Sequence, residues 1–141
     1  MRSSTFLRIA SFVTLFYFVG HTSGYPWTPS ETPADLAVIA AMKGQSFDVL
    51  GSLRTFWDFY VGFGLTNSLF TLAIAVILWQ LGSMAKTEAA RVRGMATTLF
   101  AAFLIDTVLS VRYFFIIPTV TSAIITVCLG LVVFTARTRE P

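Results

Sequence analysis

The segment WDFYVGFGLTNSLFTLAIAVILWQL occupies residues 57–81 and contains one charged residue, Asp58. A helix needs about 20 mainly apolar residues to cross roughly 30 Å of hydrocarbon at about 1.5 Å per residue. Residues 57–81 meet this length without interruption. They therefore predict a transmembrane helix.

Three further apolar runs approach the same length, at residues 5–20, 94–111 and 113–136. Together the four predicted helices define an all-α fold, a four-transmembrane-helix bundle that forms a single domain over residues 1–141. Very few residues separate the last two helices. We therefore expect these two helices to form an antiparallel hairpin.

The first apolar run has two interpretations. Arg2 and Arg8, ahead of a short apolar stretch, are also typical of a secretory signal peptide. However, Val19-Gly20-His21 is a poor small-x-small cleavage site, and bulky aromatic residues fill the stretch, namely Phe12, Phe16, Tyr17 and Phe18. We expect a retained helix, with a cleaved signal peptide as the alternative.

The composition limits the class of protein. The chain is 55% hydrophobic and 12% charged, whereas soluble domains carry about 25% charged residues. The ten Lys and Arg residues, which outnumber the acidic residues to give a net charge of +3, are scattered in ones and twos at the ends of apolar runs. This distribution is typical of membrane topology signals and excludes a phosphate-binding face, so no nucleic acid partner is expected. A single cysteine, Cys128, excludes an intrachain disulfide.

The basic residues also set the orientation, because cytoplasmic segments carry an excess of Lys and Arg. With the N-terminus inside, the cytoplasmic side carries Arg2, Arg8, Lys86, Arg91, Arg93, Arg137 and Arg139, and the other side carries Lys43, Arg54 and Arg112. The sequence therefore predicts a multi-pass protein of a bacterial inner membrane with both termini cytoplasmic.

The long first outside connection contains a predicted short helix over residues 33–43. Thr32 can act as its N-cap, Pro33 fits the first helical position, and Gly44 follows as a stop. Its apolar face carries Leu36 and Ile39. Because the helix is too short to span, we expect it to be amphipathic and to lie on the outer surface of the bundle or membrane.

Ionisable side chains are costly at membrane depth, so each one marks a candidate site. Asp106 lies roughly 18 Å along its predicted helix, in the outer half of the bilayer. We expect it to face the bundle interior. The predicted topology brings the other candidate residues to the same outer level, and these are His21, Arg54, Asp58, Tyr60 and Arg112.

Two interpretations fit this group. In the first, the residues form an outward-opening polar pocket with aromatic walls that binds a small or lipid-like ligand. In the second, Arg54, Asp58 and Arg112 mark the membrane interface, and Arg112 or a neighbouring helix neutralises Asp106. Interface placement explains most of the group but does not explain Asp106.

The sequence indicates no cofactor and no metal. His21 is the only histidine and has no thiolate partner nearby, so we expect an interfacial or hydrogen-bonded histidine rather than a metal ligand. A serine nucleophile elbow, an HExxH motif and a glycine-rich phosphate loop are all missing from the sequence. The sequence therefore favours a protein that is not an enzyme.

Small residues on one face of the 57–81 helix predict a close contact with another helix. They are Gly64, Ser68, Thr71 and Ala75. We expect an intramolecular contact, with a homodimer face as the alternative. Asn67 and Gln80 on the same helix are expected to form hydrogen bonds between helices.

Two stretches of the chain resemble a family of small bacterial four-helix membrane proteins. They are GHTSGYPWTP at residues 20–29, and residues 47–65, in which Phe56-Trp57-Asp58-Phe59-Tyr60 is the more specific part. The resemblance extends over most of the chain. It implies a four-helix membrane fold and assigns no activity.

These observations predict a membrane protein that binds a hydrophobic small ligand or a partner membrane subunit through its outer half. The alternative is a lipid- or quinone-modifying enzyme in which Asp106 or Asp58 acts as general acid or base. Membrane lipid is an expected partner in either case, and a homo-oligomer is compatible with both.

Overall fold

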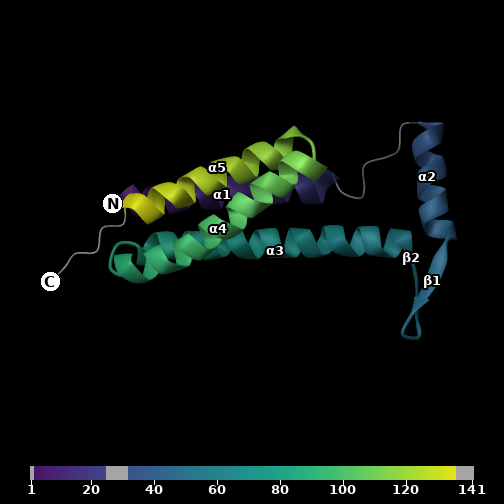
Figure 1. Ribbon diagram of the computed structural model, residues 1–141, viewed down its shortest axis with the longest axis horizontal. Helices are drawn as coiled ribbons and strands as arrows, with labels where there is room; N and C mark the ends of the chain where they lie inside the picture. Colours follow the sequence, from purple (N-terminus) through teal and green to yellow (C-terminus); the bar gives the residue numbers. More distant parts are fainter. Residues whose placement is uncertain (1, 25–31, 136–141) are drawn as a thin grey trace. The chain divides into compact units, whose positions relative to one another are not determined.

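The computed structural model describes residues 2–24 and 32–135. Within them the chain forms five helices and one β-hairpin (Figure 1): α1 (Arg2–Gly24), α2 (Pro33–Gly44), β1 (Ser46–Val49), β2 (Ser52–Thr55), α3 (Phe56–Met84), α4 (Ala89–Tyr113) and α5 (Ile116–Thr135). The fold is helical apart from this hairpin.

Four of the described helices, α1, α3, α4 and α5, are long and apolar enough to span a membrane. They confirm the four predicted long apolar helices but shift their bounds. The span predicted at 94–111 begins earlier, at Ala89, directly after the N-cap residue Glu88. The span predicted at 113–136 begins later, at Ile116, since Tyr113 is the last residue of α4.

Contacts divide the chain into two compact units. The first, named the four-helix unit, includes the chain up to Phe18 and from Thr71 onward. The second, named the hairpin unit, is Val19–Phe70. Helices α1 and α3 each contribute to both units, so the single domain expected over residues 1–141 stays a prediction.

The core of the four-helix unit contains side chains from all four long helices. They are Leu7 and Ala10 of α1, Leu78 and Leu81 of α3, Val92 and Ala96 of α4, and Ile125, Cys128, Leu129 and Val132 of α5. In lipid, close packing of this kind drives helix association, because lipid tails are as apolar as leucine. Leu7 and Ala10 are fully buried, whereas the choice between a retained helix and a cleaved signal peptide stays a prediction.

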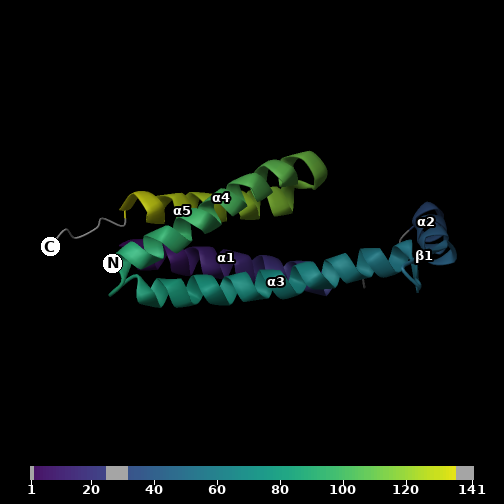
Figure 2. The ribbon, with the colours of Figure 1, turned by 60° about the horizontal axis from the view of Figure 1, so that its bottom comes forward.

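The N-terminal part of α1 runs alongside the C-terminal part of α3 (Figure 2). Ser11 Oγ of α1 donates a hydrogen bond of 2.7 Å to the Ala75 carbonyl of α3. The Arg8 guanidinium lies 3.4 Å from the centroid of the Trp79 ring, a cation–π contact that holds the charge over an aromatic face. Ala75 of the predicted small-residue face therefore makes the expected intramolecular contact.

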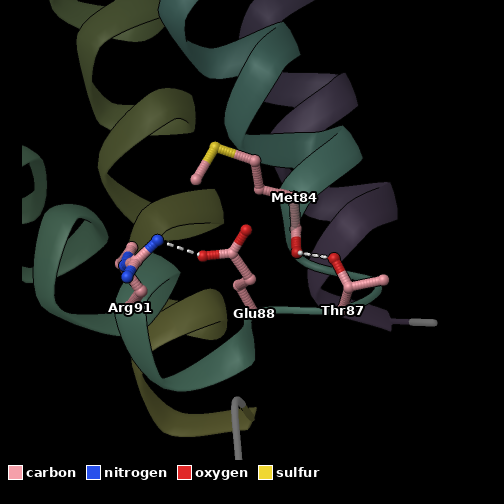
Figure 3. A network of polar contacts seen from close by, with 4 residues as sticks. All are labelled: Met84, Thr87, Glu88 and Arg91. Carbon is pink, nitrogen blue, oxygen red and sulfur yellow. Dashed lines mark hydrogen bonds and ion pairs between the residues drawn. The ribbon is translucent and has the colours of Figure 1, made fainter.

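A short turn at residues 85–88 joins α3 to α4 (Figure 3). The Glu88 N–H donates to the Met84 carbonyl at 2.8 Å, and Thr87 Oγ1 donates to the same carbonyl at 3.4 Å. Glu88 stands at the N-cap of α4 but makes no side-chain cap bond. Its carboxylate instead forms an ion pair with Arg91 (Figure 3), which fixes the polar turn.

Helices α4 and α5 form the predicted antiparallel hairpin, with only two residues between them (Figure 1). The hydroxyl oxygens of Thr107 and Thr126 lie 3.1 Å apart across the helix pair. A Cβ added at Gly130 would lie 3.2 Å from Cε2 of Phe100. Glycine at this position therefore lets the Phe100 ring pack directly on the α5 backbone.

The chain is helical as predicted, and it also forms a β-hairpin that the sequence did not predict. β1 pairs antiparallel with β2, and Phe47 lies opposite Arg54. The two turn residues, Leu50 and Gly51, both have positive φ, at 53° and 79°, as in the type I′ turns that match strand twist. Asp48 Oδ1 accepts a hydrogen bond of 2.8 Å from the Gly51 N–H. Leucine is not a turn-forming residue, so the sequence pattern did not indicate this hairpin.

Helix α2 is present at the position predicted for the short helix. Thr32 accepts a hydrogen bond of 3.2 Å from the Asp35 N–H, Pro33 opens the helix, and Gly44 ends it. No residue of α2 is buried. Its amphipathic character and its place on the outer membrane surface stay predictions.

Candidate functional site

Reciprocal hydrogen bonds between Thr55 and Asp58 fix the start of α3. Asp58 Oδ2 accepts bonds from the Thr55 N–H at 2.8 Å and from the Thr55 hydroxyl at 2.9 Å. In return, Thr55 Oγ1 accepts from the Asp58 N–H at 3.1 Å. This is the arrangement of a capping box, with aspartate in place of the usual glutamate. The local role of Asp58 is therefore to hold the junction between β2 and α3.

Aromatic rings join the hairpin to the first turns of α3. The ring centroid of Phe47 in β1 lies 5.0 Å from that of Phe56 and 5.4 Å from that of Phe59. One turn of helix also brings the Trp57 and Tyr60 rings to a centroid distance of 5.4 Å. The two contacts of the Phe47 ring, typical of aromatic pairs, hold the hairpin against α3.

An open groove of about 510 Å³ lies between the hairpin and α3, inside the hairpin unit. The hairpin contributes Val49, Ser52 and Arg54, and α3 contributes Asp58, Phe59, Gly62, Phe63 and Thr66. Counted from Phe59, the residues Gly62, Phe63 and Thr66 lie three, four and seven positions later. These four residues therefore lie along one face of α3 over about 10 Å. The groove is therefore polar at its hairpin end and mainly apolar along the helix.

Gly62 keeps the middle of this groove open. A Cβ added at Gly62 would meet no other atom within 4 Å. The neighbouring rings of Phe59 and Phe63 are exposed, by 42% and 70% respectively. The two rings contact each other, with centroids 5.9 Å apart. This face of α3 therefore presents a pair of aromatic rings next to the open position at Gly62.

Arg54 and Asp58, both predicted as candidate site residues, line the same groove. One guanidinium nitrogen of Arg54 donates a hydrogen bond of 2.7 Å to the Leu53 carbonyl. Among the residues that the structure describes, the one ion pair is Arg91 with Glu88. Arg54 and Asp58 thus share a groove without forming a salt bridge to each other.

His21 belongs to a separate polar cluster between the end of α1 and α3. Asn67 Nδ2 lies 3.4 Å from His21 Nε2. The other ring nitrogen, Nδ1, lies 3.1 Å from Ser68 Oγ. Thr22 donates to the same serine oxygen at 2.9 Å. His21 is therefore a hydrogen-bonded histidine, and Ser68 and Asn67 make the interhelical contacts that the sequence predicted.

The remaining candidate residues lie outside the groove. Tyr60 stacks on Trp57 and does not line it. Asp106 and Arg112 belong to the four-helix unit. The Arg112 guanidinium lies 5.8 Å from the centroid of the Tyr113 ring.

The Asp106 side chain is exposed, which differs from the inward orientation predicted for it. In the described part of the chain it forms no ion pair with Arg112. Asp106 lies four residues before the buried Ser110 and so close to the same side of α4. Its exposure therefore does not follow from the rotation of α4.

The described residues contain no group of three or more His, Cys, Asp or Glu side chains placed to hold a metal ion. Comparison with family models, curated proteins and solved structures finds no match. The family resemblance of the Phe56-Trp57-Asp58-Phe59-Tyr60 segment therefore has no further support. The candidate site rests on the geometry of the chain itself.

Sequence reasoning identified the charged residues of the groove but missed its walls and its scaffold. Phe59 and Phe63 were interpreted only as part of a membrane span. The Thr55-x-x-Asp58 spacing could have indicated the capping box, just as Thr32 indicated the start of α2. Ser52 and Val49 could not be placed beside α3 without the hairpin.

Proposed function

We propose that this chain is a multi-pass membrane protein that binds a hydrophobic ligand, a membrane amphiphile, in the groove between the hairpin and α3. The observation that carries this proposal is the aromatic face of α3 with an open position at Gly62. Such concave, mainly apolar surfaces with a few polar groups are typical of small-molecule sites. Arg54 at one end supplies a positive charge for the polar part of the ligand.

The proposal includes the topology indicated by the basic residues. We place the protein in a bacterial inner membrane with both termini in the cytoplasm. The hairpin and the start of α3 then lie at the outer surface, where amphiphiles present their polar groups. The groove runs along α3 from this level into the hydrocarbon. An amphiphile extends in the same direction, from its polar group at the surface to its apolar part in the hydrocarbon.

Ligand binding without chemistry is better supported than the enzyme alternative. Asp58 uses one carboxylate oxygen to accept two hydrogen bonds from Thr55, so it serves the start of the helix. Asp106 is exposed and, among the described residues, is not hydrogen-bonded to another acid, base or nucleophile. Among the described residues, neither carboxylate lies within hydrogen-bond distance of a second acid, base or nucleophile other than Thr55.

Substitution of Gly62 tests the proposal directly. A Cβ at Gly62 would meet no protein atom within 4 Å, so Gly62→Leu extends a side chain into the groove, and it also removes a helix-destabilising glycine. Gly94 in α4 has equally open surroundings, so Gly94→Leu is the matched control. We expect native mass spectrometry of gently extracted protein to show a bound amphiphile in the wild type and in Gly94→Leu. In Gly62→Leu the affinity should fall at least about tenfold, the effect of losing about 1.4 kcal/mol.

Equal retention of the amphiphile by the Gly62→Leu and Gly94→Leu variants would contradict the proposal. A mass increase equal to a second protein chain, lost only in Gly62→Leu, would also contradict it, because it would assign the groove to a partner membrane subunit. Thermal unfolding in detergent should show that both variants remain folded.

A further inference from the structure

The polar end of the groove carries two opposite charges that are not paired with each other. Arg54 and Asp58 are four residues apart and both line the groove, yet the described residues contain no salt bridge between them. Opposite charges that form no salt bridge with each other gain energy when a ligand places a complementary group on each. The groove is therefore suited to a ligand that is itself zwitterionic.

Each of the two side chains has hydrogen-bonding capacity left for a ligand. A guanidinium has five N–H donors, and among the described residues the one hydrogen bond of the Arg54 guanidinium goes to the Leu53 carbonyl. Its fork geometry matches phosphate oxygens. Asp58 uses Oδ2 for Thr55, and no hydrogen bond involves Oδ1 among the described residues. This oxygen can accept an N–H from an ammonium group.

The rest of the groove selects for a lipid. The exposed rings of Phe59 and Phe63 and the open space at Gly62 continue from the charged end along α3. A hydrated ion or a short polar metabolite would leave this aromatic surface uncovered. Acyl chains that run parallel to a membrane-spanning helix would cover it.

Resting on the proposed function, we infer that the amphiphile in this groove is a zwitterionic phospholipid with a primary ammonium group, its phosphate at Arg54 and its ammonium at Asp58. A lipid whose headgroup is only anionic would face the Asp58 carboxylate without a compensating cation. A choline headgroup has a positive charge but no N–H to donate to that carboxylate. Phosphatidylethanolamine satisfies both groups.

The test uses the full chain, delipidated in mild detergent and titrated with phosphatidylethanolamine, phosphatidylglycerol or phosphatidylcholine of identical acyl chains. Native mass spectrometry measures the affinity for each lipid. We expect phosphatidylethanolamine to bind at least about threefold more tightly than the other two, the effect of one partly exposed charge pair. Asp58→Asn keeps an oxygen that can accept from Thr55 but removes the charge, so it should abolish this preference. Arg54→Gln should lower the affinity for all three lipids.

The outcomes separate this inference from the proposed function. Equal binding of all three lipids, lost in Gly62→Leu, would overturn the headgroup assignment and leave the amphiphile site intact. A preference for phosphatidylethanolamine that persists in Asp58→Asn would also overturn it. Equal binding of all three lipids that persists in Gly62→Leu would overturn both proposals. Displacement of the lipid by excess phosphoethanolamine, which has no acyl chains, would assign a water-soluble ligand and overturn the lipid inference.

Discussion

Thr55 determines where α3 begins, because its hydroxyl and its N–H both bond to Asp58. We expect Thr55→Ala to destabilise the protein by about 1 kcal/mol, the usual cost of losing an N-cap side chain. Thermal unfolding in detergent, followed by circular dichroism, measures the change.

Thr97 provides the matched control for Thr55. Thr97 is an exposed threonine whose hydroxyl donates to the Arg93 carbonyl one turn earlier within α4, whereas Thr55 is partly buried. Such a bond does not support the helix, so Thr97→Ala should leave the melting temperature unchanged or slightly higher. Equal destabilisation by both substitutions would show that the capping box does not stabilise α3.

Asp106 shows what residue-level reasoning could and could not predict. Its position along the predicted helix followed from the rise per residue. The free-energy cost of placing a carboxylate in hydrocarbon identified it as a candidate site residue. Its exposure depends on which segments cover this level of α4, and that depends on residues far away in the sequence. The sequence thus indicated the level of the residue but not its exposed side chain.

At the scale of the element, the hairpin turn carries the one non-glycine residue with positive φ in the described chain, Leu50. A left-handed conformation costs a residue with a Cβ about 1–2 kcal/mol, whereas asparagine tolerates it well. We expect Leu50→Asn to stabilise the hairpin by up to about 1 kcal/mol. Slower hydrogen exchange of the backbone amides in β1 and β2 would measure this gain.

Leu53, an exposed leucine in β2 of the same hairpin, serves as the comparison for Leu50. It lies in a strand, where leucine is not strained, so Leu53→Asn should not slow exchange. Faster exchange in Leu50→Asn than in the wild type would contradict the argument from backbone strain.

The elements differ in how well their sequences predict them. The long helices follow from apolar length alone, and α2 follows from Thr32, Pro33 and Gly44, since each element is coded locally. The hairpin was not predicted, because Leu50 occupies a turn position that normally takes asparagine or glycine. Without the hairpin, the wall of the groove that faces α3 could not be anticipated.

At the scale of the whole molecule, the basic residues predict that both termini are cytoplasmic and that α2 is outside. A reporter that is active only in the periplasm should give no signal when fused after Pro141 and a clear signal when inserted at Gly44. The reverse pattern would contradict the orientation, and with it the placement of the groove at the outer surface.

The candidate site was predictable only in part. The sequence predicted that Arg54 and Asp58 lie at one level of the membrane, and the structure shows that both line one groove. It also grouped His21 with them, although His21 bonds instead to Ser68 and Asn67. The depth of a residue in the membrane follows from its position in the chain. Which residues contact it at that depth depends on tertiary packing.

The two units differ in how they relate to the order of synthesis. The four-helix unit joins Leu7 to Val132 in one core, so that core cannot close until α5 has left the ribosome. The hairpin unit is continuous from Val19 to Phe70 and is complete while α4 and α5 are still untranslated. All residues that line the groove belong to this continuous segment, so the formation of the groove requires neither α4 nor α5.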